Sequence, residues 1–425
     1  MLKTLIDWLN SSGIAFPGDN LFQFITSRVM LAMLLSLIIS TVFGKKLINF
    51  LRQRQVGETV RDLGLAGEQQ KKGTPTMGGI IIIVSILVPT ILLADISKTY
   101  ILLMLFATVW MGVIGFVDDY LKLRAKRLAQ QEGIAYKKGD KDGLAGWFKI
   151  LGQVVLGIAV AATLLFNETI SVYRAFTGSQ IPVNAEVKKV MLDGKERIMV
   201  KANEPITTIP FVKGHEFNYT KLLPVALRGF SWLLYIVVVI FIVTAVSNGA
   251  NITDGIDGLA TGVSAIIGVC LGIFAYASGN IRVAEYLNIM YIPNLGELSV
   301  FIAAMVGACI GFLWYNAYPA QVFMGDTGSL MLGGVIASLA FLVRKELLIP
   351  IFCGVFLVEN LSVVLQVGYF KYTKRKYGEG RRIFLMSPLH HHYQKAGFHE
   401  SKIVTRFWIV TILCVVFAIV TLKIR

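Results

Sequence analysis

Long apolar runs alternate with short polar segments along the whole chain. Ten of these runs are about as long as a helix needs to be to cross a bilayer, and they contain few charged residues. The pattern predicts an all-α, polytopic integral membrane protein with about ten transmembrane helices. We expect residues 1–425 to form a single transmembrane domain, with both termini on the same side because the number of spans is even. The runs are 29–50, 77–93, 101–117, 147–166, 232–247, 259–277, 298–314, 330–342, 347–369 and 407–424.

The composition supports this interpretation and excludes several classes of protein. Apolar residues make up 55% of the chain and charged residues only 16%, against about 25% charged residues in an average soluble domain. A soluble globular, disordered or fibrous protein is therefore excluded. The four cysteines all lie within apolar runs, so we expect buried side chains and neither a disulfide framework nor a zinc site. The N-terminal residues lack the pattern of a cleaved signal peptide, so we expect the first run to remain as a span.

The few charged residues are predominantly basic, and the net charge is +15. Lysine and arginine concentrate in segments 44–76, 118–146 and 370–405, which the ten-span pattern places on one side of the membrane. Because positive residues favour the cytoplasmic side, we expect these segments in the cytoplasm and both termini in the periplasm. Segment 167–231 is also basic and lies on the opposite side, but long loops are translocated largely regardless of their charge.

Segment 167–231 is predicted to form an extended extracytoplasmic loop. Its stretch 186–200 alternates apolar and polar residues around Asp193-Gly194, which is a signal for two strands joined by a hairpin turn. We expect a small hairpin there, without a catalytic role. The chain shows no internal repeat, which disfavours a transporter built from inverted repeats.

Carboxylates gather at the expected cytoplasmic ends of the spans. Asp118 and Asp119 follow the third run, and Lys122 lies four residues after Asp118, on the same face if the segment is helical. Asp326 precedes the eighth run between two glycines, which suit close approach of the backbone to a phosphate. Carboxylates on one face would suit Mg²⁺ held together with substrate phosphates. The alternatives are a polar cap on a span for the aspartate pair and a helix N-cap for Asp326.

A second polar group follows the fifth run, in a segment without lysine or arginine. Asn248, Asn251, Asp254 and Asp257 recur at every third position. They form one polar stripe if the segment is helical, whereas the intervening glycines favour a loop that enters a helix. Either arrangement supplies oxygen ligands, or hydrogen bonds to sugar and base edges. The alternative is a turn with an aspartate cap. Asn316 lies in another segment that contains no lysine or arginine.

A run of histidines and one buried acid complete the unusual polar positions. His390, His391 and His392 are consecutive, so they cannot all bind one metal ion from a regular helix. We therefore expect donors to a diphosphate rather than a zinc site. Glu359 and Asn360 lie inside the ninth apolar run. An ionisable residue there is a functional candidate, but a hydrogen-bonded packing pair or the lining of a lipid groove explains it equally well.

Two lysines stand at the entry to the second apolar run. Lys71 and Lys72 precede the segment GTPTMGG (73–79), which resembles a phosphate-binding loop only loosely and is not a Walker motif. The basic side chains, together with exposed backbone N–H groups, would attract an anion.

Five motifs in this chain resemble those of the phospho-N-acetylmuramoyl-pentapeptide-transferases, which are polyprenyl-phosphate N-acetylhexosamine-1-phosphate transferases. The resemblance implies ten helices in the bacterial cytoplasmic (inner) membrane and an active site on the cytoplasmic face. It also implies Mg²⁺-dependent transfer of phospho-MurNAc-pentapeptide from UDP-MurNAc-pentapeptide to undecaprenyl phosphate, which yields lipid I and UMP in the first membrane step of peptidoglycan synthesis. Segment 167–231 is longer than in the typical member. The motifs are GTPTMGG (73–79), DDYLK (118–122), NITDGIDGLA (251–260), FMGDTGSL (323–330) and MSPLHHHYQ (386–394).

The same resemblance implies roles for individual residues. Asp326 is the implied Mg²⁺ ligand, and the aspartate pair is assigned to the lipid phosphate as base or nucleophile. The sequence does not assign the role of base or nucleophile to one of the two aspartates. It also does not distinguish a direct transfer from a transfer through a phospho-enzyme. The implied catalytic residues are Asp118, Asp119, Asp326, His390, His391 and His392. The implied substrate-binding residues are Lys71, Lys72, Thr76, Lys122, Asn248, Asn251, Asp254, Gly255, Ile256, Asp257, Asn316 and Phe323, of which Asp254, Gly255, Ile256 and Phe323 match positions for uridine.

Two other functions explain part of the sequence. A related transferase that uses UDP-GlcNAc would share the aspartate motifs but not MSPLHHH, and competition between donors would distinguish it. A transporter or channel would also contain ten spans, but its polar residues would line a path at mid-membrane instead of gathering at one end. We expect the lipid bilayer and the two substrates as partners and no nucleic acid, while the sequence leaves a homodimer open.

Overall fold

The computed structural model describes residues 6, 11–12, 19–54, 71, 73–131, 143–167, 169–175, 186–192, 195–202, 205–212 and 216–423. Its α-helices are α2 (Asp19–Gln23), α3 (Ile25–Ile38), α4 (Gly44–Arg54), α5 (Gly79–Leu93), α6 (Thr99–Gln131), α7 (Gly146–Phe166), α8 (Ser231–Thr253), α9 (Leu259–Gly279), α10 (Ile281–Leu287), α11 (Leu298–Asn316), α12 (Gly325–Leu342), α13 (Ile349–Phe352), α14 (Gly354–Tyr377), α15 (Leu389–Lys395) and α16 (Glu400–Thr421). A π-helical turn, η1 (Ile39–Phe43), joins α3 to α4, and the 3₁₀ turns are η3 (Tyr219–Leu222), η4 (Val225–Phe230), η5 (Leu295–Glu297) and η6 (Glu346–Leu348). The strands are β1 (Val172–Ala175), β2 (Val187–Leu192), β3 (Lys195–Ala202), β4 (Ile206–Thr208) and β5 (Glu216–Asn218).

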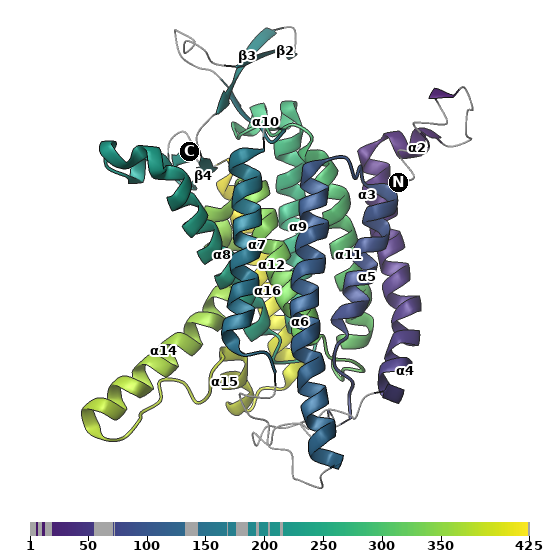
Figure 1. The fold of residues 1–425 in the computed structure, drawn as a ribbon, viewed down its shortest axis with the longest axis vertical. Coiled ribbons are helices and arrows are strands. Elements are labelled where there is room, and N and C mark those ends of the chain that lie inside the picture. Colours follow the sequence, from purple (N-terminus) through teal and green to yellow (C-terminus); the bar gives the residue numbers. More distant parts are fainter. Residues whose placement is uncertain are drawn as a thin grey trace.

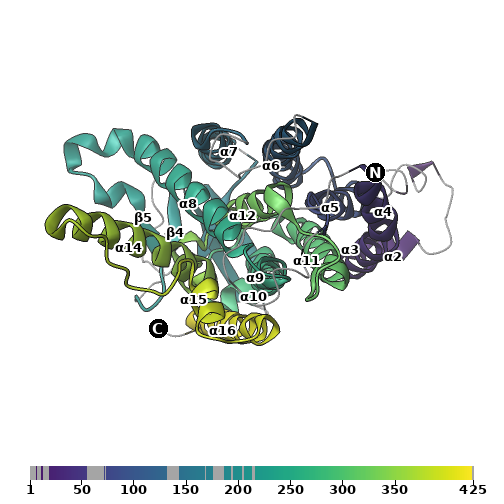
Figure 2. The same ribbon diagram turned by 90° about the horizontal axis from the view of Figure 1, so that it is seen from below.

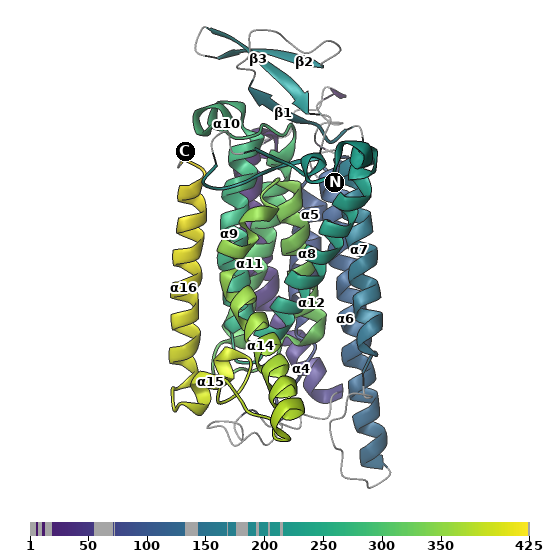
Figure 3. The same ribbon diagram turned by 90° about the vertical axis from the view of Figure 1, so that its left-hand side faces the viewer.

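The helices confirm the predicted all-α, polytopic membrane protein. Among the described residues, eight helical stretches are long and apolar enough to cross a membrane. The bent pair Glu346–Phe352 and Gly354–Tyr377 would be a ninth span, and α5 is apolar but only 15 residues long. Each predicted apolar run therefore contains a helix. The start of α3 and the end of α16 lie at the same end of the bundle (Figures 1 and 3), as an even number of spans requires.

The helix boundaries differ from the prediction at three places. Helix α6 continues to Gln131, so the aspartate pair lies within a helix instead of ending it. Helix α8 continues to Thr253, so only segment 254–258 forms the turn before α9. The polar residues in α6 and at the end of α8 remain helical because their side chains form hydrogen bonds with a neighbouring helix. The ninth run is not one straight span: it bends by 79° at Cys353, where the backbone (φ −96°, ψ 22°) leaves the helical region.

Helices α9, α11 and α12 form the centre of the bundle, and most of their residues are buried (Figure 2). Helix α12 packs against α6 and α8, and α11 packs against α3 and α9. Small residues allow such close packing between membrane helices: a Cβ on Gly79 in α5 would clash with the backbone of Gly328 in α12. These contacts bring the ends of α6, α8 and α12 together at one end of the bundle.

The strands lie at one end of the bundle, which we call the strand end (Figures 1 and 3). Strands β2 and β3 pair in antiparallel register from Val187↔Val200 to Leu192↔Lys195, which confirms the predicted pair of strands. Asp193-Gly194, the predicted turn, lies outside the described residues. Strand β1 joins β3 on its other side, and β4 pairs with β5; the sequence analysis predicted neither pairing. The opposite end, where α11 ends and α12 begins, is called the carboxylate end.

Candidate active site

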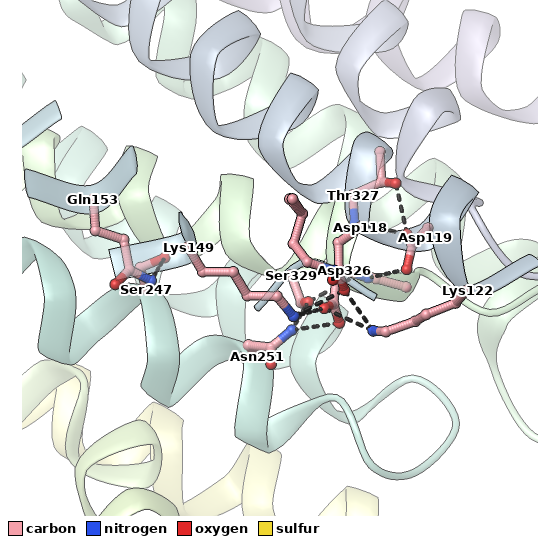
Figure 4. A network of polar contacts seen from close by, with 12 residues as sticks. Asp118, Asp119, Lys122, Lys149, Gln153, Ser247, Asn251, Asp326, Thr327 and Ser329 are labelled. Carbon is pink, nitrogen blue, oxygen red and sulfur yellow. Dashed lines mark hydrogen bonds and ion pairs between the residues drawn. The ribbon is translucent and has the colours of Figure 1, made fainter. Parts of the chain in front are cut away.

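Three carboxylates from two helices lie close together at the carboxylate end. Asp118 and Asp119 lie in α6 and Asp326 lies in the first turn of α12, and one oxygen of each lies within 4.8 Å of the others. The pair in α6 is buried, whereas Asp326 is partly exposed. The two helices can approach closely because Gly115 has no side chain; a Cβ there would clash with the backbone carbonyl of Asp326. Asp118, Asp119 and Asp326 are called the carboxylate cluster (Figure 4).

Two lysines balance part of this negative charge. Lys122, one turn after Asp118 in α6, lies 2.5 Å from Asp118 Oδ2 and 3.0 Å from Asp326 Oδ2. Lys149, near the start of α7, lies 2.8 Å from Asp118 Oδ2 and 2.6 Å from Asp326 Oδ2. Each ammonium group therefore links α6 to α12. The sequence analysis missed Lys149, and its only signal was a single lysine near the start of the apolar run 147–166.

Asp119 faces α12 and caps its first turn. Asp119 Oδ1 accepts a hydrogen bond from the backbone N–H of Asp326 at 3.2 Å. Its Oδ2 accepts from Thr327 N at 2.9 Å and from Thr327 Oγ1 at 2.7 Å. A carboxylate at this position satisfies free N–H groups and the positive end of the helix dipole. Gly325 (φ 72°) leaves room for the Asp119 carboxylate, not for a phosphate as the sequence suggested.

Asn251 joins the carboxylate cluster from α8. Its side-chain amide donates to Asp326 Oδ1 at 2.9 Å and to Ser329 Oγ at 2.8 Å. Asn248, one turn earlier, points toward α7, where it donates to Gln153 Oε1 at 3.1 Å. Gln153, which the sequence analysis did not single out, is fully buried. Of the two asparagines, the structure brings Asn251 to the cluster and holds the Asn248 amide group away from it.

Lys71, Asp257 and Glu400 form a second charged group, the Lys71 cluster. Lys71 Nζ lies 2.7 Å from Asp257 Oδ1 and 2.6 Å from Glu400 Oε1. Glu400 also accepts from Asp257 N at 2.7 Å, and Asp257 Oδ2 accepts from Ala320 N at 2.9 Å. Burial would lower the pKa of Lys71, but Glu400 and Asp257 raise it above its ordinary value, so the amine is charged. Lys72 lies outside the described residues.

Glu400 was also missed by the sequence analysis. It is buried at the first position of α16, in a part of the chain where lysine and arginine predominate. A single acid before an apolar run indicates a helix N-terminal charge, and no pattern in the sequence connects Glu400 with Lys71. The other residues of the turn before α9 differ in exposure: Asp254 is half-buried, Gly255 is exposed and Ile256 is buried.

His390 is held by Glu359 and faces the turn before α9. Its backbone N and its Nδ1 each lie 3.1 Å from the Glu359 carboxylate, and both residues are fully buried. The His390 Nε2 atom is buried and has no hydrogen-bond partner among the described residues. It lies against Gly255, where a Cβ would clash with it. Glu359 is therefore a buried, hydrogen-bonded residue that orients His390.

The other two histidines have different surroundings. His391 Nδ1 lies 2.7 Å from Gln394 Oε1. Burial, together with the neighbouring His390, lowers the pKa of His391 to about 4, so this imidazole is neutral at physiological pH. His392 Nδ1 accepts from the backbone N–H of Leu385 at 3.1 Å and fixes the segment before α15. The ring centroids of His390 and His391 lie 4.2 Å apart, whereas His392 contacts the segment before α15.

The segment GTPTMGG (73–79) packs on the loop before α12 through its backbone. Gly78 N donates to Phe323 O and Gly79 N donates to Met324 O, both at 2.9 Å. The expectation that these N–H groups are exposed to an anion is therefore wrong for Gly78 and Gly79, because the neighbouring loop accepts their hydrogen bonds. Half-buried Phe323 is held at the edge of this loop.

Thr76 and Asn316, two of the expected substrate-binding residues, lie in segments next to the loop before α12. Thr76 is half-buried in the segment before α5. Asn316 is buried at the end of α11; its Oδ1 accepts from Thr261 Oγ1 at 2.9 Å and its Nδ2 donates to Val322 O at 3.0 Å. Both ends of the Asn316 amide are thus used to hold the loop before α12 against α9.

Comparisons with known proteins agree on one family. The model of glycosyl transferase family 4 matches residues 101–344, and phospho-N-acetylmuramoyl-pentapeptide-transferase signature 1 matches residues 71–83. A phospho-N-acetylmuramoyl-pentapeptide-transferase of Flavobacterium psychrophilum is 58% identical over 100% of both chains. Proteins of the same name from Amoebophilus asiaticus and Parabacteroides distasonis are 54% identical over 96% of both chains and 51% identical over 100%. The chain belongs to the phospho-N-acetylmuramoyl-pentapeptide-transferase family.

The matched regions contain most of the site. Residues 101–344 include the carboxylate cluster and Lys149, and residues 71–83 include Lys71. Glu359, the histidines and Glu400 follow residue 344, within the full-length similarity to other phospho-N-acetylmuramoyl-pentapeptide-transferases. That similarity also covers segment 167–231, so these relatives share the region that the sequence analysis expected to set the chain apart.

Proposed function

We propose that the protein transfers phospho-MurNAc-pentapeptide from UDP-MurNAc-pentapeptide to undecaprenyl phosphate, with lipid I and UMP as products. One observation carries the proposal: the carboxylate cluster with its two lysines, in a chain whose relatives bear the name of this transferase. The reaction joins a nucleotide-linked donor to a lipid phosphate. A site at the end of a membrane helix bundle is accessible to both kinds of substrate.

The cations of the site account for the binding of two anionic substrates. A diphosphate and a lipid phosphate repel each other, so the enzyme has to neutralise both. Lys122 and Lys149 lie between α6 and α12 and are only partly buried, so their ammonium groups are available to phosphate oxygens. His390 Nε2, which lacks a partner among the described residues, provides a polar contact beside Gly255. Groups fixed in this way stabilise charge that develops on a leaving phosphate.

Asp118 is the residue to which we assign the proton transfer. Asp119 is engaged by three hydrogen bonds from α12, so its role is to position Asp326. Asp118 instead faces Lys122 and Lys149, the groups that would hold the lipid phosphate. A phosphate monoester has a second pKa of about 6. At neutral pH most of the lipid phosphate is therefore already deprotonated, and Asp118 has to accept a proton only from the minority that is not.

Direct attack of the lipid phosphate on the donor follows from this assignment. In a one-step transfer Asp118 only accepts a proton, and its contacts with Leu144 N and the two lysines keep the carboxylate in place. Inversion of configuration at phosphorus is the expected outcome. A covalent phospho-sugar enzyme trapped without the lipid acceptor would contradict a one-step transfer.

Mg²⁺ is the cofactor that we propose for the carboxylate cluster. The cluster offers only carboxylate oxygens, the ligand type that Mg²⁺ prefers, and its oxygens lie close enough together to hold one ion. Asp326 would be the main protein ligand because its side chain is more exposed than that of Asp118. When bound, the ion would neutralise the donor diphosphate and stabilise the UMP leaving group.

We place the carboxylate end in the cytoplasm. The described basic residues near this end lie in α4, in the second half of α6 and in the segment from α14 to α16, and lysine and arginine are retained on the cytoplasmic side of bacterial membrane proteins. The strand end would then face the periplasm, as we expect for segment 167–231. Thiol labelling of single cysteines introduced at Lys46 and Lys221 in sealed cells tests the orientation.

The experiment that tests the function is an assay with the purified protein. It is incubated with UDP-MurNAc-pentapeptide, undecaprenyl phosphate and Mg²⁺, and UMP and lipid I are measured together. The proposal predicts both products in equal amounts. An excess of UDP-GlcNAc should not compete; if UDP-GlcNAc is used instead, the protein is the related transferase. Uptake of a solute without release of UMP would contradict the proposal.

A further inference from the structure

A basic pocket lies under α14, outside the carboxylate cluster and the Lys71 cluster. It has a volume of about 550 Å³, and its wall contains the cations Lys371, Arg382 and Lys395 together with Gln366, Phe370 and Ser387. None of the residues that line it is acidic, and none of the three cations forms an ion pair with a described residue. The pocket therefore carries an uncompensated positive charge.

The pocket is built from two segments that are fixed against each other. One wall is a face of α14, on which Gln366 and Phe370 are one turn apart. The other wall is segment 378–388, which turns back along α14 after Gly378 (φ 79°). Gln366 is buried and holds this segment: its Oε1 accepts from the backbone N–H groups of Ile383 and Phe384 at 3.0 Å.

Further hydrogen bonds fix the same wall. Gln366 Nε2 donates to Phe384 O at 3.1 Å, and Thr373 Oγ1 accepts from Arg381 N at 2.9 Å. On the other side, His392 Nδ1 accepts from Leu385 N and so ties segment 378–388 to α15. This assigns a structural task to His392. The pocket is therefore preformed, so a ligand would not have to order it.

The position of the pocket selects the part of the substrate that could reach it. Glu359 and His390 mark the point where α14 meets the site. Gln366 and Lys371 lie seven and twelve residues further along α14, which is about 10 to 18 Å at the rise of an α-helix. The reacting phosphates belong at the carboxylate cluster and cannot occupy the pocket at the same time. A pentapeptide that extends from the sugar spans about 17 Å.

We propose that this pocket binds the free C-terminal carboxylate of the donor's pentapeptide. The inference rests on the proposed function, because it takes the donor from there. A peptide attached to a sugar acid through its N-terminus keeps one carboxylate at its far end. Arg382 provides a planar pair of donors that matches a carboxylate, Lys371 and Lys395 add charge, and the Phe370 side of the pocket accommodates an apolar peptide side chain. The pocket thus selects donors with a complete peptide.

The test compares two donors that differ only at the peptide terminus. One is UDP-MurNAc-pentapeptide and the other is the same molecule with a C-terminal carboxamide. Their dissociation constants are measured on the purified full-length protein by equilibrium dialysis. The wild type should bind the carboxylate form about fivefold more tightly, the upper end of the range expected for an exposed ion pair. Lys371→Ala/Arg382→Ala should bind both forms equally.

A matched variant controls for the loss of positive charge. Lys374→Ala/Arg375→Ala removes one lysine and one arginine from α14 but does not alter the pocket wall, and it should keep the wild-type preference. Equal binding of the two donors by the wild type, or a preference that survives in Lys371→Ala/Arg382→Ala, would overturn the proposal. Phosphatidylglycerol vesicles test a lipid headgroup as the occupant instead. The proposal would be overturned if Lys371→Ala/Arg382→Ala kept the preference but bound these vesicles less well than the control. Carboxylate-dependent binding without UMP release would support the pocket and refute the proposed transfer.

Discussion

Asp119 of α6 accepts two hydrogen bonds from Thr327, one from its backbone N–H at 2.9 Å and one from its hydroxyl at 2.7 Å. A third comes from the backbone N–H of Asp326. The cap of α12 is thus supplied by another helix, and it fixes the direction in which Asp326 points. Two adjacent aspartates with similar burial therefore make different contacts: Asp119 bonds the first turn of α12, and Asp118 contacts Lys122 and Lys149.

Asp119→Ala should destabilise the protein. The change leaves N–H groups of α12 without their cap, which costs about 1 to 2 kcal/mol of folding free energy. Thermal unfolding in detergent measures the effect. Thr327→Val removes only the hydroxyl contact and should lower the melting temperature less. Equal melting temperatures for Asp119→Ala and the wild type would show that the cap does not stabilise α12.

Lys149→Met should reduce turnover by about a hundredfold or more, the range observed when one donor to a charged transition state is removed. The variant loses one of two cations shared by Asp118 and Asp326. The rate of UMP release measures the effect. Lys221→Met, an exposed lysine at the strand end, is the matched control and should retain full activity. Full activity of Lys149→Met would remove Lys149 from the site.

Glu400→Gln should weaken donor binding and change the maximal rate much less. Glu400 holds both Lys71 Nζ and the backbone N–H of Asp257, and the neutral amide keeps the shape but not the charge. We expect the KM for the donor to rise about tenfold, as for the loss of a charge-assisted hydrogen bond. Exposed Glu379→Gln is the control. An unchanged KM would mean that the Lys71 cluster has only a structural role.

The stability of the fold should fall with acidification in part through His391. Its pKa is about 4 in the folded protein and ordinarily near 6.5, so the stability it contributes is present above pH 6.5 and is lost as the pH falls toward 4. Melting temperatures between pH 7.5 and 4.5 should therefore fall more steeply for the wild type than for His391→Gln. Parallel curves would contradict a buried, neutral imidazole at this position.

The sequence predicted the fold class well because a bilayer imposes long apolar helices on any chain that crosses it. It also identified the aspartates that form the carboxylate cluster. It missed Lys149 and Glu400, because one charged residue near the edge of an apolar run has no signal of its own. Their importance comes from partners far away in the chain: Asp118 lies 31 residues before Lys149.

Other differences arise from tertiary contacts that periodicity cannot show. The bend at Cys353 separates α13 from α14 within one apolar run, and the resulting course of α14 places Glu359 beside His390. The polar groups of Asn316 bond Thr261 and Val322, so a residue that the resemblance assigns to the substrate also shapes a loop. The glycines around Asp326 make room for other parts of the chain.

We propose that the carboxylate cluster is the catalytic site of a phospho-MurNAc-pentapeptide transfer. The most direct test of this proposal is the rate of UMP release by purified wild-type protein and by Asp326→Asn, with both substrates and with Mg²⁺ present or removed by EDTA. Thermal unfolding confirms that the variant is folded. We expect UMP release by the wild type only when Mg²⁺ is present and less than about 1% of that rate for Asp326→Asn. A folded Asp326→Asn variant that retains most of the Mg²⁺-dependent rate would contradict it.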